Sequence, residues 1–264
     1  MKAFYQHTFP KEQCLVRRCL AYKLHFHHQI ELVYMFEGSA KAVVDGTEYS
    51  IGAGDVLVVF PNQLHEYKVA EGEVFFITIF PPEILPEFKE LFYGMIPKSN
   101  VLSTGNKNEM LKYIAERLPV IKESDNKYKE HMYRGLIAAF FGELLSELEF
   151  VKAKNGDLSV VRQILSYCNK NYLNDISLEE AAEYLHVSKF YVSHLLNDKL
   201  NISFNGYINS LRVADAVAML DDGGVDMTEI AQKSGFNTVR TFNRAFKDIY
   251  GVSPTMYKKM KKDT

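Results

Sequence analysis

The chain has 264 residues, of which 47% are hydrophobic and 24% charged, so its length predicts more than one domain and its composition excludes disorder throughout. The formal net charge of −2 gives no overall attraction to nucleic acid, although basic residues gather after residue 240. No stretch approaches the roughly 18 apolar residues of a membrane span, and the first ten residues lack a signal-peptide core, so we expect a cytoplasmic protein with no membrane partner. Three cysteines without a CxxC pair predict no cysteine zinc site.

Short apolar runs broken by turn signals occupy residues 24–80. We expect strands at Glu31–Phe36, Ala40–Val44, Val56–Phe60 and Val74–Phe80, which are rich in β-branched and aromatic residues. Asp45-Gly46 predicts a tight hairpin turn. Because no helical pattern separates these runs, their spacing predicts a small antiparallel barrel or sandwich.

Polar residues that can bind ligands cluster near the first of these strands. Alternation puts His25, His27 and Glu31 on one face, and His65 follows in a later turn. Three imidazoles and a carboxylate inside a barrel suit divalent iron, manganese, nickel or zinc. Without metal, the same groups can hydrogen-bond a polar effector beside the aromatic ring of Tyr34. We predict the metal-free pocket, with no metal and no cofactor, and keep the metal site as the alternative.

Two helices are predicted after the strands, at Asn108–Leu118 and Tyr128–Phe150. The second has an unusually wide apolar stripe, so we expect it to pack against the barrel and against the same helix of a second subunit in a homodimer. The polar segment Val151–Asp157 is the predicted linker. The expected domains are residues 1–95, the helical linker and dimerisation region 96–156, and residues 157–264.

A first helix-turn-helix unit is predicted from residue 177 onward. Ser177 and Glu180 form a capping box at the start of a short helix. After a turn at residues 186–188, Ser188 caps a second helix that runs to about Lys199.

The same layout recurs about fifty residues later. A short helix begins at Met227, Gly235 permits a left-handed turn, and Thr238–Lys247 forms the second helix. The long helix expected at Phe204–Leu220 joins the two units, so that both can meet successive major grooves on one face of DNA.

Specific residue types mark this C-terminal part. They are Ile176-Ser177-Leu178-Glu179, Ser203-Phe204, Tyr207, Leu211-Arg212, Ala216, Leu220, Ile230-Ala231, Gly235-Phe236, Phe242, Arg244, Phe246-Lys247, Gly251-Val252-Ser253-Pro254 and Tyr257. With them, residues 176–257 resemble the DNA-binding domain of the AraC/XylS family of regulators. The first unit departs from the family pattern at His194, Leu196 and Asn201, where Arg, Phe and Gly are usual.

The resemblance implies that the second helix of each unit lies in the major groove of double-stranded DNA. The base-contacting residues it implies are Ser188, Phe190, Ser193 and His194 in the first unit, and Thr238, Arg240, Asn243 and Arg244 in the second. Arginine can bond bidentately to guanine and asparagine to adenine, so the second unit has the more typical chemistry.

The histidines, with Gly38 and Gly54-Asp55, make residues 24–80 similar to the cupin barrels that precede the DNA-binding domain in this family. Gln63 stands where cupins usually have Gly. The implied fold class is α+β: an N-terminal cupin-like antiparallel β-barrel, a helical linker, and a C-terminal all-α domain with two helix-turn-helix units.

The combined expectation is a sequence-specific transcriptional regulator, an activator by family default, that works with RNA polymerase and is not an enzyme. A small polar effector, a sugar by analogy, is expected at His25, His27, Glu31, Tyr34 and His65. One alternative is a metal-dependent cupin enzyme fused to a DNA-binding domain. The other is a constitutive DNA-binding protein whose barrel serves only dimerisation.

Overall fold

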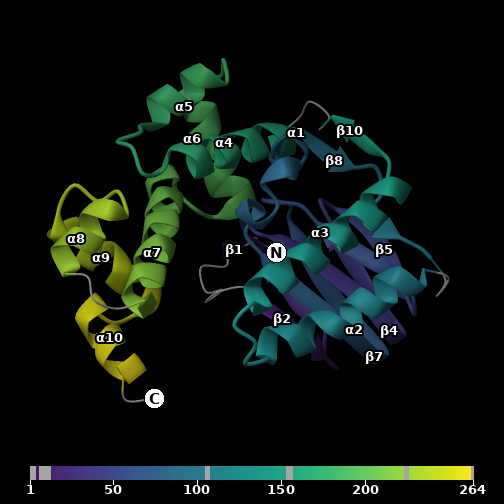
Figure 1. Ribbon diagram of the computed structural model, residues 1–264. Coiled ribbons are helices and arrows are strands. Elements are labelled where there is room, and N and C mark those ends of the chain that lie inside the picture. The colour runs from purple at the N-terminus through teal and green to yellow at the C-terminus, as the bar shows by residue number, and fades with distance from the viewer. Residues whose placement is uncertain (1–3, 6–12, 105–107, 153–156, 223–225, 263–264) are drawn as a thin grey trace. The chain divides into compact units, whose positions relative to one another are not determined.

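The computed structural model describes residues 4–5, 13–104, 108–152, 157–222 and 226–262 (Figure 1). The chain divides into two compact units, which separate near residue 155, and Phe4–Tyr5 groups with the second of them. Residues 153–156 of the predicted linker Val151–Asp157 lie outside the described residues. Among the described helices, none combines the length and the apolar character that crossing a membrane requires.

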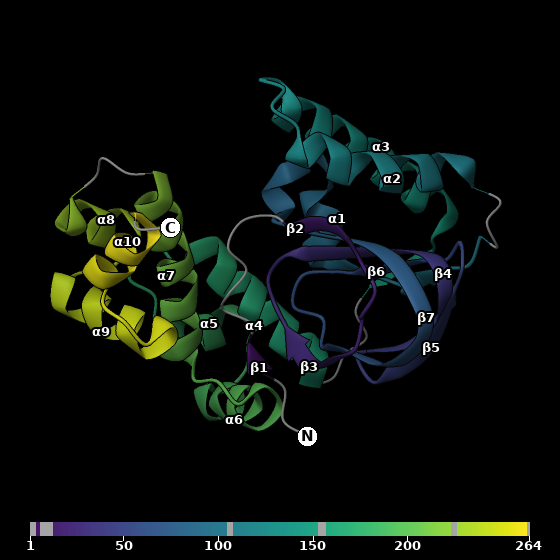
Figure 2. The same ribbon diagram turned by 90° about the horizontal axis from the view of Figure 1, so that it is seen from below.

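An antiparallel β-sheet dominates the N-terminal unit. Its strands are β2 (Gln13–Arg17), β3 (Tyr22–Phe26), β4 (Ile30–Val44), β5 (Thr47–Gly52), β6 (Val56–Val59), β7 (His65–Phe80) and β9 (Val101–Leu102). A short ribbon pairs β8 (Met95–Pro97) with β10 (Phe150–Lys152). A two-residue strand, β1 (Phe4–Tyr5), precedes them. Figure 2 shows the long strands curled into a barrel.

The pairing of β4 with β7 organises this sheet. It runs from Ile30 opposite Phe80 to Val44 opposite His65, with register shifts between Met35 and Lys41. The predicted strands Glu31–Phe36 and Ala40–Val44 are therefore one bent strand, because the bulges let the chain pass the bend without leaving the sheet. The predicted hairpin at Asp45-Gly46 is confirmed, and both residues have positive φ.

Two apolar cores lie on opposite faces of the sheet. Inside the barrel, Val33 and Met35 of β4 pack with Leu57, Val59 and Phe75. On the outer face, the remaining apolar side chains of β4 and its neighbours pack against helices. Those helices are α1 (Lys89–Gly94), α2 (Glu109–Glu123) and α3 (Lys129–Glu147), with the 3₁₀ turns η1 (Pro82–Ile84) and η2 (Pro86–Phe88). Figure 2 shows α2 and α3 side by side on this face.

The wide apolar stripe of α3 is covered within the chain. Tyr133, Ile137, Phe140, Phe141 and Leu144 are fully buried against the sheet and α2. The Tyr133 hydroxyl also forms a 2.9 Å hydrogen bond with Thr78 on β7. Residues 109–147, expected as part of a separate dimerisation region, thus pack onto the barrel as part of one compact unit, while Leu136, Leu145 and Leu148 of the stripe stay half-buried.

The described residues from 157 to 262 are helices and their connections, as predicted. The helices are α4 (Asp157–Asn171), α5 (Leu178–Tyr184), α6 (Lys189–Leu200), α7 (Phe204–Asp222), α8 (Met227–Lys233), α9 (Val239–Tyr250) and α10 (Pro254–Lys262). Figure 1 shows α7 between α4–α6 and α8–α10. The fold class is therefore confirmed: an antiparallel β domain followed by a helical domain with two helix-turn-helix units.

Candidate functional site

Local hydrogen bonds define the first helix-turn-helix unit. The Ser177 hydroxyl accepts from the Glu180 amide, and the Glu180 carboxylate accepts from the Ser177 amide, so the predicted capping box is confirmed. His186 adopts a left-handed conformation in the turn. The Ser188 hydroxyl then caps α6 by accepting from the Tyr191 amide at 3.1 Å. These caps fix where the second helix begins.

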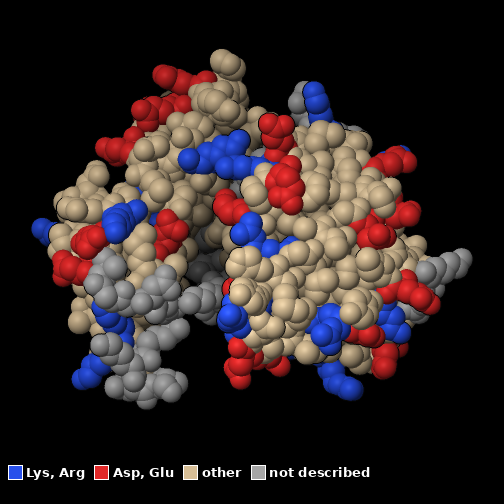
Figure 3. Space-filling view, in the orientation of Figure 1, with Lys and Arg blue, Asp and Glu red and all other residues tan. Residues whose placement is uncertain are grey.

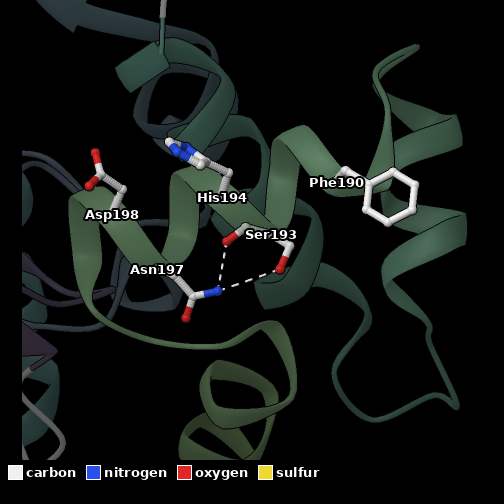
Figure 4. Close-up of a pocket in the computed structure, with 5 residues that line it drawn as sticks. All are labelled: Phe190, Ser193, His194, Asn197 and Asp198. Carbon is white, nitrogen blue, oxygen red and sulfur yellow. Dashed lines mark hydrogen bonds between the residues drawn. The ribbon is translucent and has the colours of Figure 1, made fainter.

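The exposed side of α6 carries the side chains predicted to contact bases. Phe190 is 77% exposed, His194 is exposed and Ser193 is half-buried. Together with Asn197 and Asp198 they line a surface hollow on this helix (Figure 4). The Asn197 amide donates to the backbone oxygen of Ser193 at 2.8 Å and lies 3.4 Å from its hydroxyl oxygen. No positively charged side chain lies among these five.

The second unit is built in the same way with different chemistry. The Thr238 hydroxyl caps α9 by accepting from the Thr241 amide, while Phe242 and Phe246 are fully buried. Their burial turns the opposite side outward. The exposed residues there are Thr238, Arg240, Asn243, Arg244 and Lys247. The last four recur at helical spacing and form one continuous polar face.

The two recognition helices correspond residue for residue at an offset of fifty. Ser188 and Thr238 are the N-caps, both helices have twelve residues, and both end at a left-handed residue, Asn201 or Gly251. Asparagine replaces the usual glycine at this end because it tolerates that conformation better than most residues.

The two helix-turn-helix units differ in net charge. Residues 178–200 carry four acidic and two basic side chains, a net charge of −2 with histidine neutral. Residues 227–250 carry two acidic and four basic side chains, a net charge of +2. Figure 3 shows acidic side chains gathered over α5. The electrostatic attraction for phosphate is therefore concentrated in the second unit.

Arg212 on α7 contacts both helix-turn-helix units. Its guanidinium donates to the backbone oxygens of Tyr172 and Asn174 at 2.6 and 2.7 Å, and it lies over the Phe236 ring. Gly235, at φ +85°, packs against the same loop, where an added Cβ would lie 3.0 Å from the Leu173 Cα. The turn of the second unit thus rests on the loop that leads into the first.

In the N-terminal unit, four of the five predicted effector-binding residues converge inside the barrel. His25 lies on β3, His27 directly after it, Glu31 on β4 and His65 at the start of β7. Each is at most 2% exposed, and one potential ligand atom from each falls within 4.8 Å of the others. The strand pairing explains this convergence, because His25 and His65 are direct cross-strand partners.

The pKa values of these groups are strongly perturbed. Burial lowers the pKa of the His25 imidazole to about 3 and also lowers that of His27. Burial would raise the pKa of the Glu31 carboxyl, but the contacts with His27 and His65 outweigh it and hold that pKa well below its usual range. Burial and the nearby carboxylate raise the pKa of Tyr67 well above its usual range. At neutral pH the lowered pKa values leave Glu31 ionised and the rings of His25 and His27 neutral.

Tyr34, the fifth predicted effector-binding residue, lies outside the barrel interior. Its side chain is 1% exposed in the core between the sheet and the helices, on the face of β4 opposite to Glu31. The expectation that it borders the same pocket is corrected by strand alternation, which separates positions 31 and 34. Its hydroxyl is buried without a hydrogen-bond partner in that core.

Two residues that the sequence analysis did not assign to the site support it. The Tyr67 hydroxyl donates to the Glu31 carboxylate. The side-chain oxygen of Gln63 accepts from Phe60 and Asn100, and its amide donates to Asp45, so the departure from the usual glycine anchors the turn before His65. The two-residue spacing of His65 and Tyr67 was the available signal for the tyrosine.

Two family models match this chain. One, described as an AraC-like ligand binding domain, matches residues 12–103, and a helix-turn-helix domain matches residues 181–260. The chain belongs to the AraC family of transcriptional regulators. In this AraC-family regulator the first match contains the whole barrel cluster and the second contains both recognition helices. DNA binding by the helical domain and ligand binding by the barrel domain follow as its general activities.

Its curated relatives are described as transcriptional regulators. The uncharacterized HTH-type regulator YdiP of Escherichia coli is 24% identical over 255 residues, which covers 90% of this chain and 82% of YdiP. An uncharacterized HTH-type regulator of Staphylococcus aureus is 20% identical over 229 residues and 85% of this chain. This chain spans only 31% of the staphylococcal protein.

Solved structures also match. ToxT from Vibrio cholerae is 16% identical, with a TM-score of 0.46 and coverage of 95% of this chain and 98% of ToxT. ToxT with bound unsaturated fatty acid is 17% identical with a TM-score of 0.45, and covers 94% of each chain. The C-terminal domain of AraT from Geobacillus stearothermophilus is 34% identical with a TM-score of 0.36, over 38% of this chain and 84% of that domain.

The contact between the second helix-turn-helix unit and the loop before the first can be tested with a matched pair of glycine substitutions. Gly235→Ala and Gly251→Ala each force alanine into a left-handed conformation, which costs about 1–2 kcal/mol. Only Gly235 has crowded surroundings, since nothing lies within 4 Å of a Cβ at Gly251. We expect Gly235→Ala to lower the free energy of unfolding more than Gly251→Ala. Hydrogen exchange of residues 227–250 in urea measures both, and equal losses would contradict the contact.

Proposed function

We propose that this protein is a transcriptional activator in which occupation of the barrel site by a small polar effector changes how the two recognition helices bind DNA. The observation that carries the proposal is the exposed face of α9, where Arg240, Asn243 and Arg244 stand over a buried phenylalanine core. Family membership supports cooperation with RNA polymerase in the cytoplasm. The relatives' description as regulators favours this function over a cupin enzyme.

The two units have different parts in this proposal. The basic face of α9 supplies the attraction to phosphates and direct base contacts. The nearly neutral face of α6 supplies Ser188, Phe190, Ser193 and His194 as base contacts, with the exposed Phe190 ring suited to a thymine methyl group. Specificity is then shared between the units, while the salt dependence of binding comes mainly from the second.

Arg244→Ala should weaken specific DNA binding by about 1–3 kcal/mol if Arg244 contacts a base. Duplexes selected from a random-sequence pool provide the specific site, and titration against them and against an unselected duplex gives the ratio of specific to nonspecific affinity. Arg134→Ala, at an exposed arginine on α3, removes the same charge from the N-terminal unit and should leave that ratio unchanged. A ratio unchanged in Arg244→Ala would remove Arg244 from the base contacts.

The proposed effector class is a carbohydrate. Its hydroxyl groups match the carboxylate and imidazole groups of Glu31, His25, His27 and His65, which are buried and accept or donate hydrogen bonds. The choice of sugar rests on analogy with the family. A bound effector would have to favour one of two DNA-binding states, because equal affinity for both shifts nothing.

Thermal melting against a panel of sugars tests the effector. A sugar that binds the folded barrel should raise the melting midpoint. Glu31→Gln should abolish this rise, whereas Tyr34→Phe, which alters the opposite face of β4, should keep it. If no sugar raises the midpoint of the unchanged protein, the carbohydrate assignment is wrong.

We also propose a homodimer, now through α2 rather than α3. Met110, Tyr113 and Val120 are 49–55% exposed on α2, and their spacing places them along one side of the helix. Leu144 is fully buried in the core and cannot report on a dimer.

A charge at Tyr113 should separate such a dimer. Tyr113→Asp would place a carboxylate in an apolar interface, where burial of an unpaired charge is unfavourable. We expect sedimentation equilibrium to give the mass of a single 30.3 kDa chain for this variant and twice that mass for the unchanged protein. Ser146→Asp, on the exposed side of α3, should remain dimeric. The same mass for Tyr113→Asp and the unchanged protein would count against α2.

A further inference from the structure

The barrel cluster has a hydrogen-bond arrangement that points to a bound cation. The Nδ1 atoms of His25, His27 and His65 lie 2.9, 3.1 and 2.9 Å from the backbone oxygens of Lys23, Gln29 and Gln63. A carbonyl oxygen only accepts, so each Nδ1 carries the hydrogen. In a neutral ring the lone pair is then on Nε2. Backbone carbonyls orient metal-binding histidines in this way in many proteins.

The Nε2 atoms of His27 and His65 lie near the carboxylate of Glu31. The Nε2 of His27 lies 3.1 Å from Oε2 of Glu31, and that of His65 lies 3.6 Å from the same oxygen. The other oxygen, Oε1, accepts the hydrogen bond from Tyr67. Two lone-pair atoms therefore converge on one carboxylate oxygen in a buried site.

A proton alone does not satisfy this arrangement. A proton on Nε2 of His27 would complete its hydrogen bond with Glu31. It would leave the Nε2 of His65, which is fully buried and has no hydrogen-bond partner, aimed at the same centre. A buried polar atom left without a partner is destabilising. A cation between the ligand atoms satisfies both imidazoles and the carboxylate at once.

We propose that His25, His27, His65 and Glu31 bind one divalent transition-metal ion. Three imidazoles and a carboxylate are the donor set of borderline ions such as Zn²⁺, Ni²⁺, Co²⁺ and Fe²⁺. Two ligands of a tetrahedral ion with bonds of about 2.0 Å lie about 3.3 Å apart, which the distances of 3.1 and 3.6 Å bracket. The proposal takes up the alternative that the sequence analysis kept beside the metal-free pocket.

The metal ion would give the sensor a way to bind an effector by coordination. Four protein ligands leave a divalent ion of higher coordination number with open positions, which oxygen atoms of a polar effector can fill. This regulatory meaning rests on the proposed function, whereas the metal site itself does not.

Metal content of the full-length, tag-free protein tests the site. The protein is stripped with a chelator, reloaded with Zn²⁺ or Co²⁺, and measured by elemental analysis, visible absorption and thermal melting. We expect about one ion per chain, Co²⁺ absorption typical of mixed nitrogen and oxygen ligands, and a higher melting midpoint in the loaded form. His65→Ala should weaken metal binding by more than about 100-fold, the upper range for loss of a merely orienting partner.

Matched controls separate binding from folding. His131→Ala removes an exposed histidine of α3 and should keep full metal content. If His65→Ala fails to fold, the Co²⁺ spectrum of the unchanged protein still tests the site. Less than about a tenth of an ion per chain with every metal offered, and a melting midpoint insensitive to chelator, would overturn the proposal and leave a proton as the bridging cation.

DNA binding keeps the two hypotheses apart. A protein that takes up no metal but binds its selected DNA site with sugar-dependent affinity overturns the metal site alone. A protein that binds one metal ion but shows no preference for any DNA sequence overturns the proposed function and supports the metal site.

Discussion

The antiparallel pairing of β4 with β7 is the constraint on which the N-terminal unit depends. Every residue from Ile30 to Met35 is buried, because one face of β4 closes the barrel and the other lies under α2 and α3. Alternation along this one strand decides which side chains can meet a ligand and which belong to the helix layer. In this pairing Glu31 lies opposite Ile79 and His65 lies opposite Val44, so the contacts of His65 and Tyr67 with Glu31 cross the barrel interior. Thr78, beside Ile79, hydrogen-bonds Tyr133 of α3 on the outer face.

The helical unit shows how one backbone plan can serve two kinds of contact. Caps at Ser188 and Thr238 and twelve-residue helices repeat at an offset of fifty residues, so the backbones are equivalent. Their exposed faces are not, since one presents an aromatic ring and small polar groups and the other presents cations. In the proposed mode of DNA binding both helices contact bases, and the second supplies most of the electrostatic attraction. Arg212 connects the two helix-turn-helix units, because it bonds the loop before the first and lies over Phe236 of the second.

Local signals predicted most of the fold. The capping box at Ser177, the turn at Asp45-Gly46 and the fifty-residue repeat depend on neighbouring residues only, and all three are present. Tyr34 was misplaced because both faces of β4 are buried, so an aromatic residue there does not identify the barrel interior. The end of α2 was missed because Pro119 normally stops a helix, whereas burial of Leu118 and Ile121 carries this one on to Glu123. Tertiary packing decided both points.

The nineteen residues of α7 also set the angle by which the second recognition helix is rotated, about the axis of α7, relative to the first. Each residue in an α-helix adds about 1.5 Å of length and about 100° of rotation, at 3.6 residues per turn. Loss or gain of a single residue in α7 would thus turn the second recognition helix to a different side while hardly changing its separation from the first. Seven residues, nearly two full turns, would restore the direction to within about 20°. Length changes in α7 are therefore tolerable only in steps close to whole turns. A helix thus constrains both the distance and the direction between the recognition helices, whereas a flexible connection of equal span would constrain only the distance.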